Sequence, residues 1–576
     1  MGRPPRSAPA STMLTRRPAD ALTAAVVAAR AELAVVAPSL AAAFADALPR
    51  AVQAVARRLV GAAYREDLAG LREPGRLSGF AGRSGGFVDG VTRHAFDRVE
   101  IRLVRDPAGV LRELPARLGG GDLAIELADA AVKMALAYAR RPAPGTLDRV
   151  AALSPDDQMV QFERLSTEGH NLHPCGRTRL GWSIADALAH DLESPATTVG
   201  FVAVRRDLHV GDDLGRVVDV SAHRPGYAVQ PVHGWQLDRV LRERYRGLIR
   251  AGAVVPLDGV TLTATPTAAL RTLLLDPRPG HPRRYLKVSL DIQVTSTRRT
   301  ISVASTRNGP ALSALLHRVL AGEPRILLLT EEAGASALVG ERHRDLGAII
   351  RRGLDGLVVP GELAVPGGAL YAASTGGTVL AELVDRYAST RRITARGAAA
   401  SAFVDEYARL LLPPLLRLAT RHGIAIEAHL QNCVPTFCHG VPHRLVLRDF
   451  AGLRLHLPRF AARGHPVTLW PGSVIGTDDV NVMRAKLAYS ALQAHLGELV
   501  VGLVCTHGLD EDRAWRSVRA VIDEVYDELR SDPTVAVDAA ADHAFLTAPS
   551  VPHKALVQMR LYGDGDRYVP VRNPLW

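Results

Sequence analysis

The sequence predicts an α+β protein made of a helical part, a β-rich part and a mixed part, in that order. Three observations predict this class. Ala-rich segments with helical periodicity dominate residues 20–160, short β-rich runs separated by loops fill residues 166–310, and long helices surround a β segment in the last third. The chain of 576 residues is also about four times as long as a domain of ~150 residues, so several domains are expected.

The N-terminal part, residues 1–160, is expected to form a helical domain behind a disordered basic leader. Helices are predicted over residues 20–66, with a break at Ala37-Pro38, and again up to Arg140. Between them, the alternation of polar and apolar side chains from His94 to Leu103 predicts a half-buried strand. Ser154-Pro155 is a typical helix start, because Pro fits the first helical turn.

The composition favours a cytoplasmic protein. No run of 18 apolar residues is present, so no transmembrane helix is expected. The pair Arg16-Arg17 precedes an apolar stretch, as in a twin-arginine signal, but Asp20, Arg30 and Glu32 interrupt that stretch. Four cysteines are too few for a disulfide scaffold. Met1 and Met13 are both compatible with the start of the protein.

The middle part, residues 161–345, is predicted to be β-rich, with strands at Thr197 to Val204 and within Leu286 to Val303. Gly-rich stretches between residues 359 and 368 lie near the start of the last part, residues 346–576. There, helices are expected over residues 394–422, 482–504 and 510–529, around a β segment from Ile424 to Leu455. These three parts are the domains that the sequence predicts.

The net charge of +11, from 70 Lys and Arg against 59 Asp and Glu, suggests an anionic partner. A nucleic-acid-binding protein would need a basic face with interleaved aromatic residues, but aromatic residues make up only 5% of the chain. We therefore expect no nucleic-acid partner and attribute most of the arginines to a GC-rich genome. The cations include only four lysines, each a candidate for a site that needs a compact ammonium: Lys133, Lys287, Lys486 and Lys554.

The densest polar cluster runs from Thr167 to Gly181 and contains two His and two Arg among glycines. Such a loop can face a polyanion such as a triphosphate. An ordinary polar turn is one alternative. Another is a zinc site made by His170, His173 and Cys175, which the neighbouring arginines and the lack of a fourth ligand disfavour.

A polar strand face is predicted between Lys287 and Arg299, shortly after Arg271-Thr272. Side chains alternate between the two faces of a strand. Lys287 and every second residue after it would therefore share one polar face, while Val288 and every second residue after it would face a core. A wholly polar face is unusual unless it lines a wet groove, with Lys287 at its head where phosphate could bind. A solvated sheet face is the alternative.

Two polar motifs follow apolar strand residues in the last part, Glu427 to Asn432 and Arg448-Asp449. Carboxylate and amide oxygens suit Mg²⁺, which bridges phosphates. The arrangement resembles the catalytic loop and Asp-Phe-Gly element of kinase-like phosphotransferases, except that Gln431 replaces the catalytic Asp. A zinc site is disfavoured by the Pro and Phe within the same segment, and its ligands would be Cys433, Cys438, His439 and His443.

In this order, the clusters resemble one family: the siderophore synthetases that work independently of nonribosomal peptide synthetases, of the aerobactin-synthetase (IucA/IucC) type. The resemblance covers residues 160–576, and its departures from the family pattern are Asn171, Arg177, Gly234 and Ala269. Each matching element is weak alone, but their order and spacing are specific. The elements are Glu168 to Gly181, Pro231 to Gln236, Arg271-Thr272, Lys287 to Arg299, Glu427 to Asn432, Arg448-Asp449, and Lys554 to Leu561 with Asn573-Pro574-Leu575.

The resemblance implies a cupped hand with a helical thumb (1–160), β-rich fingers that bind ATP (161–345) and a kinase-like palm that binds metal and substrate (346–576). It implies ATP-dependent adenylation of a carboxylic acid and condensation with an amine or alcohol, releasing AMP and pyrophosphate. Citrate is the favoured acid, and α-ketoglutarate or a citryl or succinyl intermediate is the alternative. A kinase-like small-molecule phosphotransferase is a more distant alternative. We also expect a homodimer and no membrane partner.

The resemblance further implies a role for each matching residue. The catalytic set is Lys287, Arg299, His429 and His170. ATP contacts are expected from His170, Arg271, Thr272, Lys287 and Gln431. The ligands of Mg²⁺ are expected to be Glu427 and Asp449. Substrate carboxylates are expected to contact Arg299, His429 and Lys554.

Overall fold

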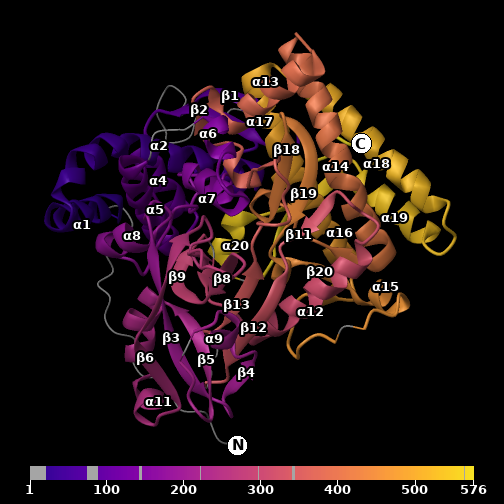
Figure 1. Cartoon of the computed structure of the whole chain (residues 1–576). Helices are drawn as coiled ribbons and strands as arrows, with labels where there is room; N and C mark the ends of the chain where they lie inside the picture. The colour runs from indigo at the N-terminus through magenta and orange to yellow at the C-terminus, as the bar shows by residue number, and fades with distance from the viewer. Residues whose placement is uncertain are drawn as a thin grey trace, which may run out of the picture.

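The computed structural model describes residues 21–73, 88–141, 146–220, 222–295, 297–339, 344–466, 468–563 and 565–576. The predicted basic leader lies outside these residues. The N-terminal helices, a large sheet and the C-terminal helices occupy neighbouring regions of the molecule (Figure 1). The protein therefore has the mixed helix-and-strand fold that the sequence predicts.

The N-terminal helices up to Arg140 pack over one Ala- and Leu-rich core, whereas Leu147, Val150 and Phe162 of the two helices that follow pack into the largest core of the protein. The predicted break at Pro38 is confirmed, because the short 3₁₀ turn η2 (Pro38–Leu40) separates α1 (Ala21–Val36) from α2 (Ala41–Arg65). The helices that follow are η3 (Leu68–Gly70), α4 (Pro107–Arg117), α5 (Gly121–Arg140), α6 (Leu147–Ala151) and α7 (Pro155–Leu165). Ser154 caps α7 by accepting a hydrogen bond from the backbone N–H of Asp157 (3.3 Å).

The predicted strand from His94 to Leu103 is only partly correct. β1 (Val88–Arg93) pairs with β2 (Val99–Val104) in an antiparallel hairpin, and the residues between them form the turn. Phe96 and Asp97 have φ angles of 55° and 53°, which no strand residue adopts. The first half of the predicted strand, residues 94–98, is therefore a turn.

An eight-stranded antiparallel sheet forms the middle of the molecule, in the order β4-β12-β13-β8-β7-β6-β3-β5. Its strands are β3 (Thr197–Arg205), β4 (His209–Gly211), β5 (Tyr227–His233), β6 (Val254–Pro266), β7 (Thr272–Leu275), β8 (Arg284–Val288), β12 (Glu331–Ala337) and β13 (Ala348–Arg352). Helix α8 (Ile184–His190) packs into the core of the N-terminal helices. The helices next to the sheet are α9 (Leu214–Val217), the π-helix η4 (Gln236–Leu241), α10 (Arg242–Arg244), α11 (Arg246–Arg250) and α12 (Val303–Val319). Lys287 of β8 pairs with Thr272 of β7 and Ile349 of β13, which places it in the interior of the sheet.

The segment from Leu286 to Val303 is not one strand. β8 ends at Val288, and β9 (Leu290–Val294) pairs with β10 (Thr297–Arg299) in a separate hairpin. Of the described residues on the polar face, only Thr295 at its end lines a cavity. Asp291 instead accepts a hydrogen bond from Arg244 (2.6 Å), and Gln293 donates one to Glu126 (2.6 Å). Polar groups from distant segments satisfy these side chains.

The C-terminal part combines the predicted helices with a four-stranded sheet, β11-β19-β18-β14. The strands are β11 (Ile326–Leu328), β14 (Leu363–Ala364), β18 (Cys433–Cys438) and β19 (Val441–Leu447). In addition, β15 (Ala373–Ser374) pairs with β16 (Gly377–Thr378), and a small three-stranded sheet consists of β17 (Ile424–Ala425), β20 (Arg454–His456) and β21 (Gly476–Thr477). The longer helices are α13 (Val379–Arg391), α14 (Arg396–His422), α16 (Val480–Leu487), the π-helix η9 (Ala488–Gly497), α17 (Glu498–His507), α18 (Glu511–Arg530) and α19 (Ala536–Leu546). Shorter ones are η6 (Gly367–Ala369), η7 (Leu430–Asn432), η8 (Phe450–Gly452) and α15 (Leu457–Ala462).

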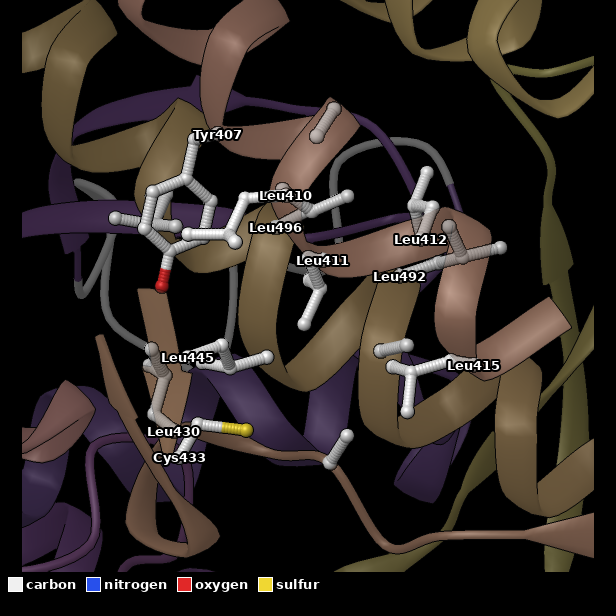
Figure 2. Close-up of a cluster of buried hydrophobic side chains, with 14 of the residues drawn as sticks. Tyr407, Leu410, Leu411, Leu412, Leu415, Leu430, Cys433, Leu445, Leu492 and Leu496 are labelled. Carbon is white, nitrogen blue, oxygen red and sulfur yellow. The ribbon is translucent and has the colours of Figure 1, made fainter. Parts of the chain in front are cut away.

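The largest hydrophobic core lies where α14 and η9 meet the four-stranded sheet (Figure 2). Within it, the hydroxyl of Tyr407 lies 2.7 Å from Nε2 of His495. Leu430 and Cys433 are buried in the same core. The polar motif from Glu427 to Asn432 is therefore anchored by its own apolar residue, which fixes His429 and Gln431 on either side of it.

One helical stretch among the described residues, Val480–His507, is long and apolar enough to cross a membrane, although the sequence predicted none. Its most apolar window is 89% buried inside the protein. The hydropathy of this stretch is therefore explained by its place in the core.

The last elements return to the N-terminal helices. β22 (Ser550–Lys554) pairs with β23 (Tyr568–Arg572), and α20 (Leu556–Tyr562) lies between them in the chain. Val557 of α20 is buried in the core of the N-terminal helices. Glu66 directly follows the last residue of α2. Its carboxylate accepts hydrogen bonds from the backbone N–H groups of Val557 and Gln558 (2.8 Å each), so it caps the N-terminus of α20.

Candidate active site

Four of the predicted site residues line one cavity of about 100 Å³. They are His170, Arg299, His429 and Gln431; His429 and Gln431 belong to the same turn, η7, and the other two come from separate segments. The cavity is also lined by three arginines and an aromatic residue that the prediction did not assign to the site: Arg177, Arg179, Arg448 and Tyr489. The tertiary fold thus joins all three polar clusters of the sequence around one cationic space.

The loop that carries His170 is closed by two glycines. Gly169 has a φ of +68°, and a Cβ there would lie 2.5 Å from the backbone oxygen of Gly176. The Nδ1 atom of His170 accepts hydrogen bonds from the backbone N–H groups of Leu172 (3.1 Å) and His173 (3.2 Å). Burial lowers the pKa of His170 to about 3, as do His429 and Arg58. His170 is therefore neutral, with its ring proton on Nε2 as a hydrogen-bond donor.

Arg299 is held at the cavity by its neighbours. Its guanidinium donates to Oγ1 of Thr295 (3.1 Å), and Arg271 donates to the backbone oxygens of Arg299 (3.0 Å) and Thr300 (2.9 Å). Burial, together with the positive charges of Arg271 and Arg179, lowers the pKa of Arg299 to about 9. An anion bound here would relieve that repulsion. Arg271 does not line the cavity itself, and it positions Arg299 instead.

Lys287 and Asp449 form a buried ion pair next to the cavity lining. The ammonium of Lys287 contacts Oδ1 of Asp449, and Arg351 lies 3.9 Å from the same oxygen. Burial raises the pKa of Asp449, but Lys287, Arg351 and Arg271 outweigh that effect and lower it well below its usual value. Asp449 is therefore ionised, and its φ of 68° aims it back toward the sheet that carries Lys287.

Glu427 is paired with Lys486, a residue that the prediction did not assign to the site. Oε1 of Glu427 accepts a hydrogen bond from the ammonium of Lys486 (2.8 Å). Lys554 contacts Asp566 (2.9 Å), and Lys486 lies 3.8 Å from the same side chain. The scarcity of lysine in the sequence was the one signal that could have identified Lys486 as a candidate. In the structure, all four lysines of the chain form ion pairs with carboxylates.

The ion pair between Glu427 and Lys486 is expected to make stability pH-dependent. Burial raises the pKa of Glu427, but Lys486, His429 and Lys554 lower it from 4.5 to about 2. A lowered pKa in the folded state gives stability that is present above pH 4.5 and is lost as the pH falls toward 2. Between pH 6 and pH 3 this residue should contribute a loss of about 2 kcal/mol in the free energy of unfolding.

Urea unfolding of the wild type and of Glu427→Gln at both pH values tests this prediction. The variant should lose about 2 kcal/mol less than the wild type over the same interval. Equal losses in the two proteins would contradict the assignment.

The carboxylates of Glu427 and Asp449 fit a Mg²⁺ ion as partial ligands. Both are ionised, and each has a second oxygen besides the one bonded to a lysine. Magnesium in nucleotide sites uses one or two carboxylates and takes its other ligands from water and phosphate. Within the described ranges, no group of three or more His, Cys, Asp or Glu side chains is placed to hold a metal ion. Neither zinc alternative is therefore supported.

Comparison with known proteins supports the resemblance read from the sequence. Residues 158–372 match the IucA/IucC family. Over 478 residues, the chain is 26% identical to D-ornithine–citrate ligase from Staphylococcus aureus, covering 73% of this chain and 70% of that protein. The predicted resemblance to the IucA/IucC family is therefore confirmed. Residues 401–569 also match the family described as ferric iron reductase FhuF-like transporter.

Solved structures of similar proteins share the fold of this chain. The petrobactin biosynthesis protein AsbB from Bacillus anthracis has a TM-score of 0.76 at 21% identity, with 93% of this chain and 98% of that chain covered. ATP-bound aerobactin synthetase IucA from Klebsiella pneumoniae has a TM-score of 0.67 at 20% identity, with 84% and 92% covered. Both matches span all three regions of the chain.

Proposed function

We propose that this protein is an ATP-dependent ligase of siderophore biosynthesis that joins a polycarboxylic acid, citrate in the first place, to an amine or alcohol. The observation that carries the proposal is the convergence of His170, Arg299, His429 and Gln431 on one cavity. The cavity is lined mainly by arginines and neutral polar groups, and its one carboxylate, Glu163, is paired with Arg448. Such a space, with no carboxylate base at Gln431, suits a polyanion better than phosphoryl transfer to a hydroxyl. The names of the relatives, citrate ligase among them, support citrate.

The proposed chemistry has two steps. An oxygen of the substrate carboxylate attacks the α-phosphorus of ATP, and pyrophosphate leaves. The nucleophilic nitrogen or oxygen of the acceptor then attacks the acyl carbon, AMP leaves, and the acceptor loses a proton to solvent or base. No enzyme nucleophile is required, because AMP is the leaving group. The protein contributes positioning and charge stabilisation.

In this proposal each site residue has a separate task. His170, Lys287 and Gln431 contact ATP, Arg271 and Thr272 support that contact, and Arg299 and His429 contact the substrate carboxylates. Glu427 and Asp449 would hold Mg²⁺, which neutralises phosphate charge when it is bound. Lys554 acts through Asp566, which it shares with Lys486.

Further parts of the proposal concern the whole protein. We propose that residues 1–160, 161–345 and 346–576 correspond to thumb, fingers and kinase-like palm, that the protein works in the cytoplasm, and that it forms a homodimer. The C-terminal helix α20 contacts the first of these parts through Glu66.

Product analysis tests the proposed reaction. With ATP, Mg²⁺, citrate and hydroxylamine as a generic acceptor, the protein should release AMP and pyrophosphate in equal amounts and form a citryl hydroxamate. Citrate should be replaced in parallel reactions by α-ketoglutarate and by a succinylated amine. Release of ADP and phosphate, or no release with any of the three acids, would refute the proposal.

A further inference from the structure

A second and larger cavity, of about 270 Å³, lies beside the first. It is enclosed by α2, β2, α17 and the loop before His170, elements that meet in the upper part of Figure 1. Asn171 lines both cavities, and its amide donates to Glu498 (2.9 Å) in the second one. The two spaces are thus neighbours that share one wall.

The second cavity contains equal numbers of acidic and basic side chains: Arg57, Arg58, Arg65, Arg98, Glu66, Glu100, Glu168 and Glu498. The acidic side chains of this cavity all have partners among the described residues, but not all of the basic ones do. Arg98 contacts both Glu498 (3.0 Å) and Glu100 (2.5 Å). The remaining two carboxylates also have partners: Glu168 forms an ion pair with Arg58 (2.6 Å), and Glu66 accepts hydrogen bonds from the start of α20. Every carboxylate of the cavity therefore has a partner.

Arg65 is left without one. It is only 5% exposed, yet its guanidinium forms no hydrogen bond or ion pair with any residue that the structure describes. The hydroxyl of Tyr371, which lines the same cavity, is buried and also has no hydrogen-bond partner within the described part of the chain. Buried charged and polar groups are normally satisfied, so two unsatisfied donors around one cavity indicate a missing acceptor.

We propose that this second cavity binds the acceptor substrate, and that the acceptor is an amino acid whose carboxylate is bound by Arg65 and Tyr371. This inference rests on the proposed ligase function. A carboxylate supplies the acceptor oxygens that both donors lack, and a guanidinium binds it with two parallel hydrogen bonds. The rest of the amino acid then extends past Asn171 toward the first cavity, where its nucleophilic group meets the activated acid.

A simple diamine or amino alcohol fits this cavity less well, because it offers no anion to Arg65. The carboxylate could instead belong to the acid that is activated, since a citrate carboxylate has the same chemistry. The experiment must therefore separate the acceptor from the activated acid.

Matched acceptor pairs make this separation. Ornithine, 2,3-diaminopropionate and serine are each compared with the decarboxylated counterpart, namely putrescine, ethylenediamine and ethanolamine, in the pyrophosphate-release assay. For the wild type, kcat/KM should be about 100-fold higher for the amino acid of at least one pair. Arg65→Met should remove most of that preference while leaving the KM for citrate and the rate with hydroxylamine within about twofold of the wild type.

Two further variants sharpen the test. Tyr371→Phe removes only a hydroxyl that has no hydrogen-bond partner among the described residues, so it should raise the KM for the amino acid about tenfold without lowering the melting temperature. Arg102→Met, an exposed arginine on β2, is the matched control and should behave as the wild type. Arg65→Met should also keep or raise the melting temperature, because it removes an unpaired buried charge, whereas a structural arginine would lower it.

The outcomes are distinct. Turnover with hydroxylamine but no preference for any amino acid would overturn this inference and leave the proposed function intact. A raised KM for citrate in Arg65→Met would assign the cavity to the activated acid and would also overturn it. No pyrophosphate release with any acceptor would refute the proposed function itself.

Discussion

Replacing Lys287 with Met is expected to lower the rate of pyrophosphate release by about 10²–10³-fold, the cost of losing one preorganised charge at a reacting phosphate. Lys287 is 3% exposed and lies in the interior of the large sheet, so its ammonium cannot be replaced by water or by a neighbouring lysine. Met has a similar length and no charge. Asp449 keeps Arg351 as a partner at 3.9 Å, so the fold should survive.

The control for this variant is another buried ion pair, outside both cavities. Arg459 is 7% exposed and contacts Asp542 (2.8 Å) in the C-terminal helices. Arg459→Met should lower the melting temperature, since it leaves Asp542 with fewer partners, but its rate per folded molecule should stay within about twofold of the wild type. If both variants lose activity in proportion to lost stability, Lys287 is structural and the assignment fails.

Replacing Arg299 with Ala is expected to lower kcat/KM for citrate by about 100-fold, as the loss of a charge-assisted contact to a carboxylate predicts. Arg299 lines the first cavity and is held there by Thr295 and Arg271. The loss should appear mainly in the KM for citrate rather than in the KM for ATP. Arg299→Lys should restore only part of it, because an ammonium cannot form the two parallel hydrogen bonds of a guanidinium.

The preceding residue provides a matched control. Arg298 has the same charge, but its side chain is 64% exposed and contacts Asp291 (2.5 Å), which does not line the cavity. Arg298→Ala should leave the KM for citrate within about twofold of the wild type. Equal effects of the two substitutions would show that net charge, rather than the position of Arg299, governs citrate binding.

Local periodicity determined most of the helical structure. The helices predicted over residues 394–422 and 510–529 are α14 and α18, and the helix predicted over residues 482–504 lies within the stretch Val480–His507. These helices can be predicted from the sequence because the apolar residues of one face recur every three to four positions along the same segment. The strand expected from His94 to Leu103 was partly wrong for a related reason. A turn with two residues at positive φ can mimic the alternation of a short strand.

The candidate site was predictable only as a set of segments. The motifs at His170, Arg299, His429 and Gln431 are readable in order along the chain, and they do line one cavity. The sequence could not tell that Arg271 lies behind Arg299, nor that the polar strand face after Lys287 is satisfied by residues from other elements. It also gave no sign of the second cavity, whose walls come from residues 54 to 556.

The sequence by itself determined the fold class, the long helices, the polar motifs and the scarcity of lysine. Only the tertiary structure decided which charge meets which: Lys287 pairs with Asp449, 162 residues away, and Lys486 pairs with Glu427, 59 residues away. Arg65 has no partner among the residues that the structure describes. The physical reason is that helical periodicity is a property of neighbouring residues, whereas an ion pair forms wherever packing brings two side chains together. Pairing, and the lack of it at Arg65, therefore depends on the packing of the whole chain.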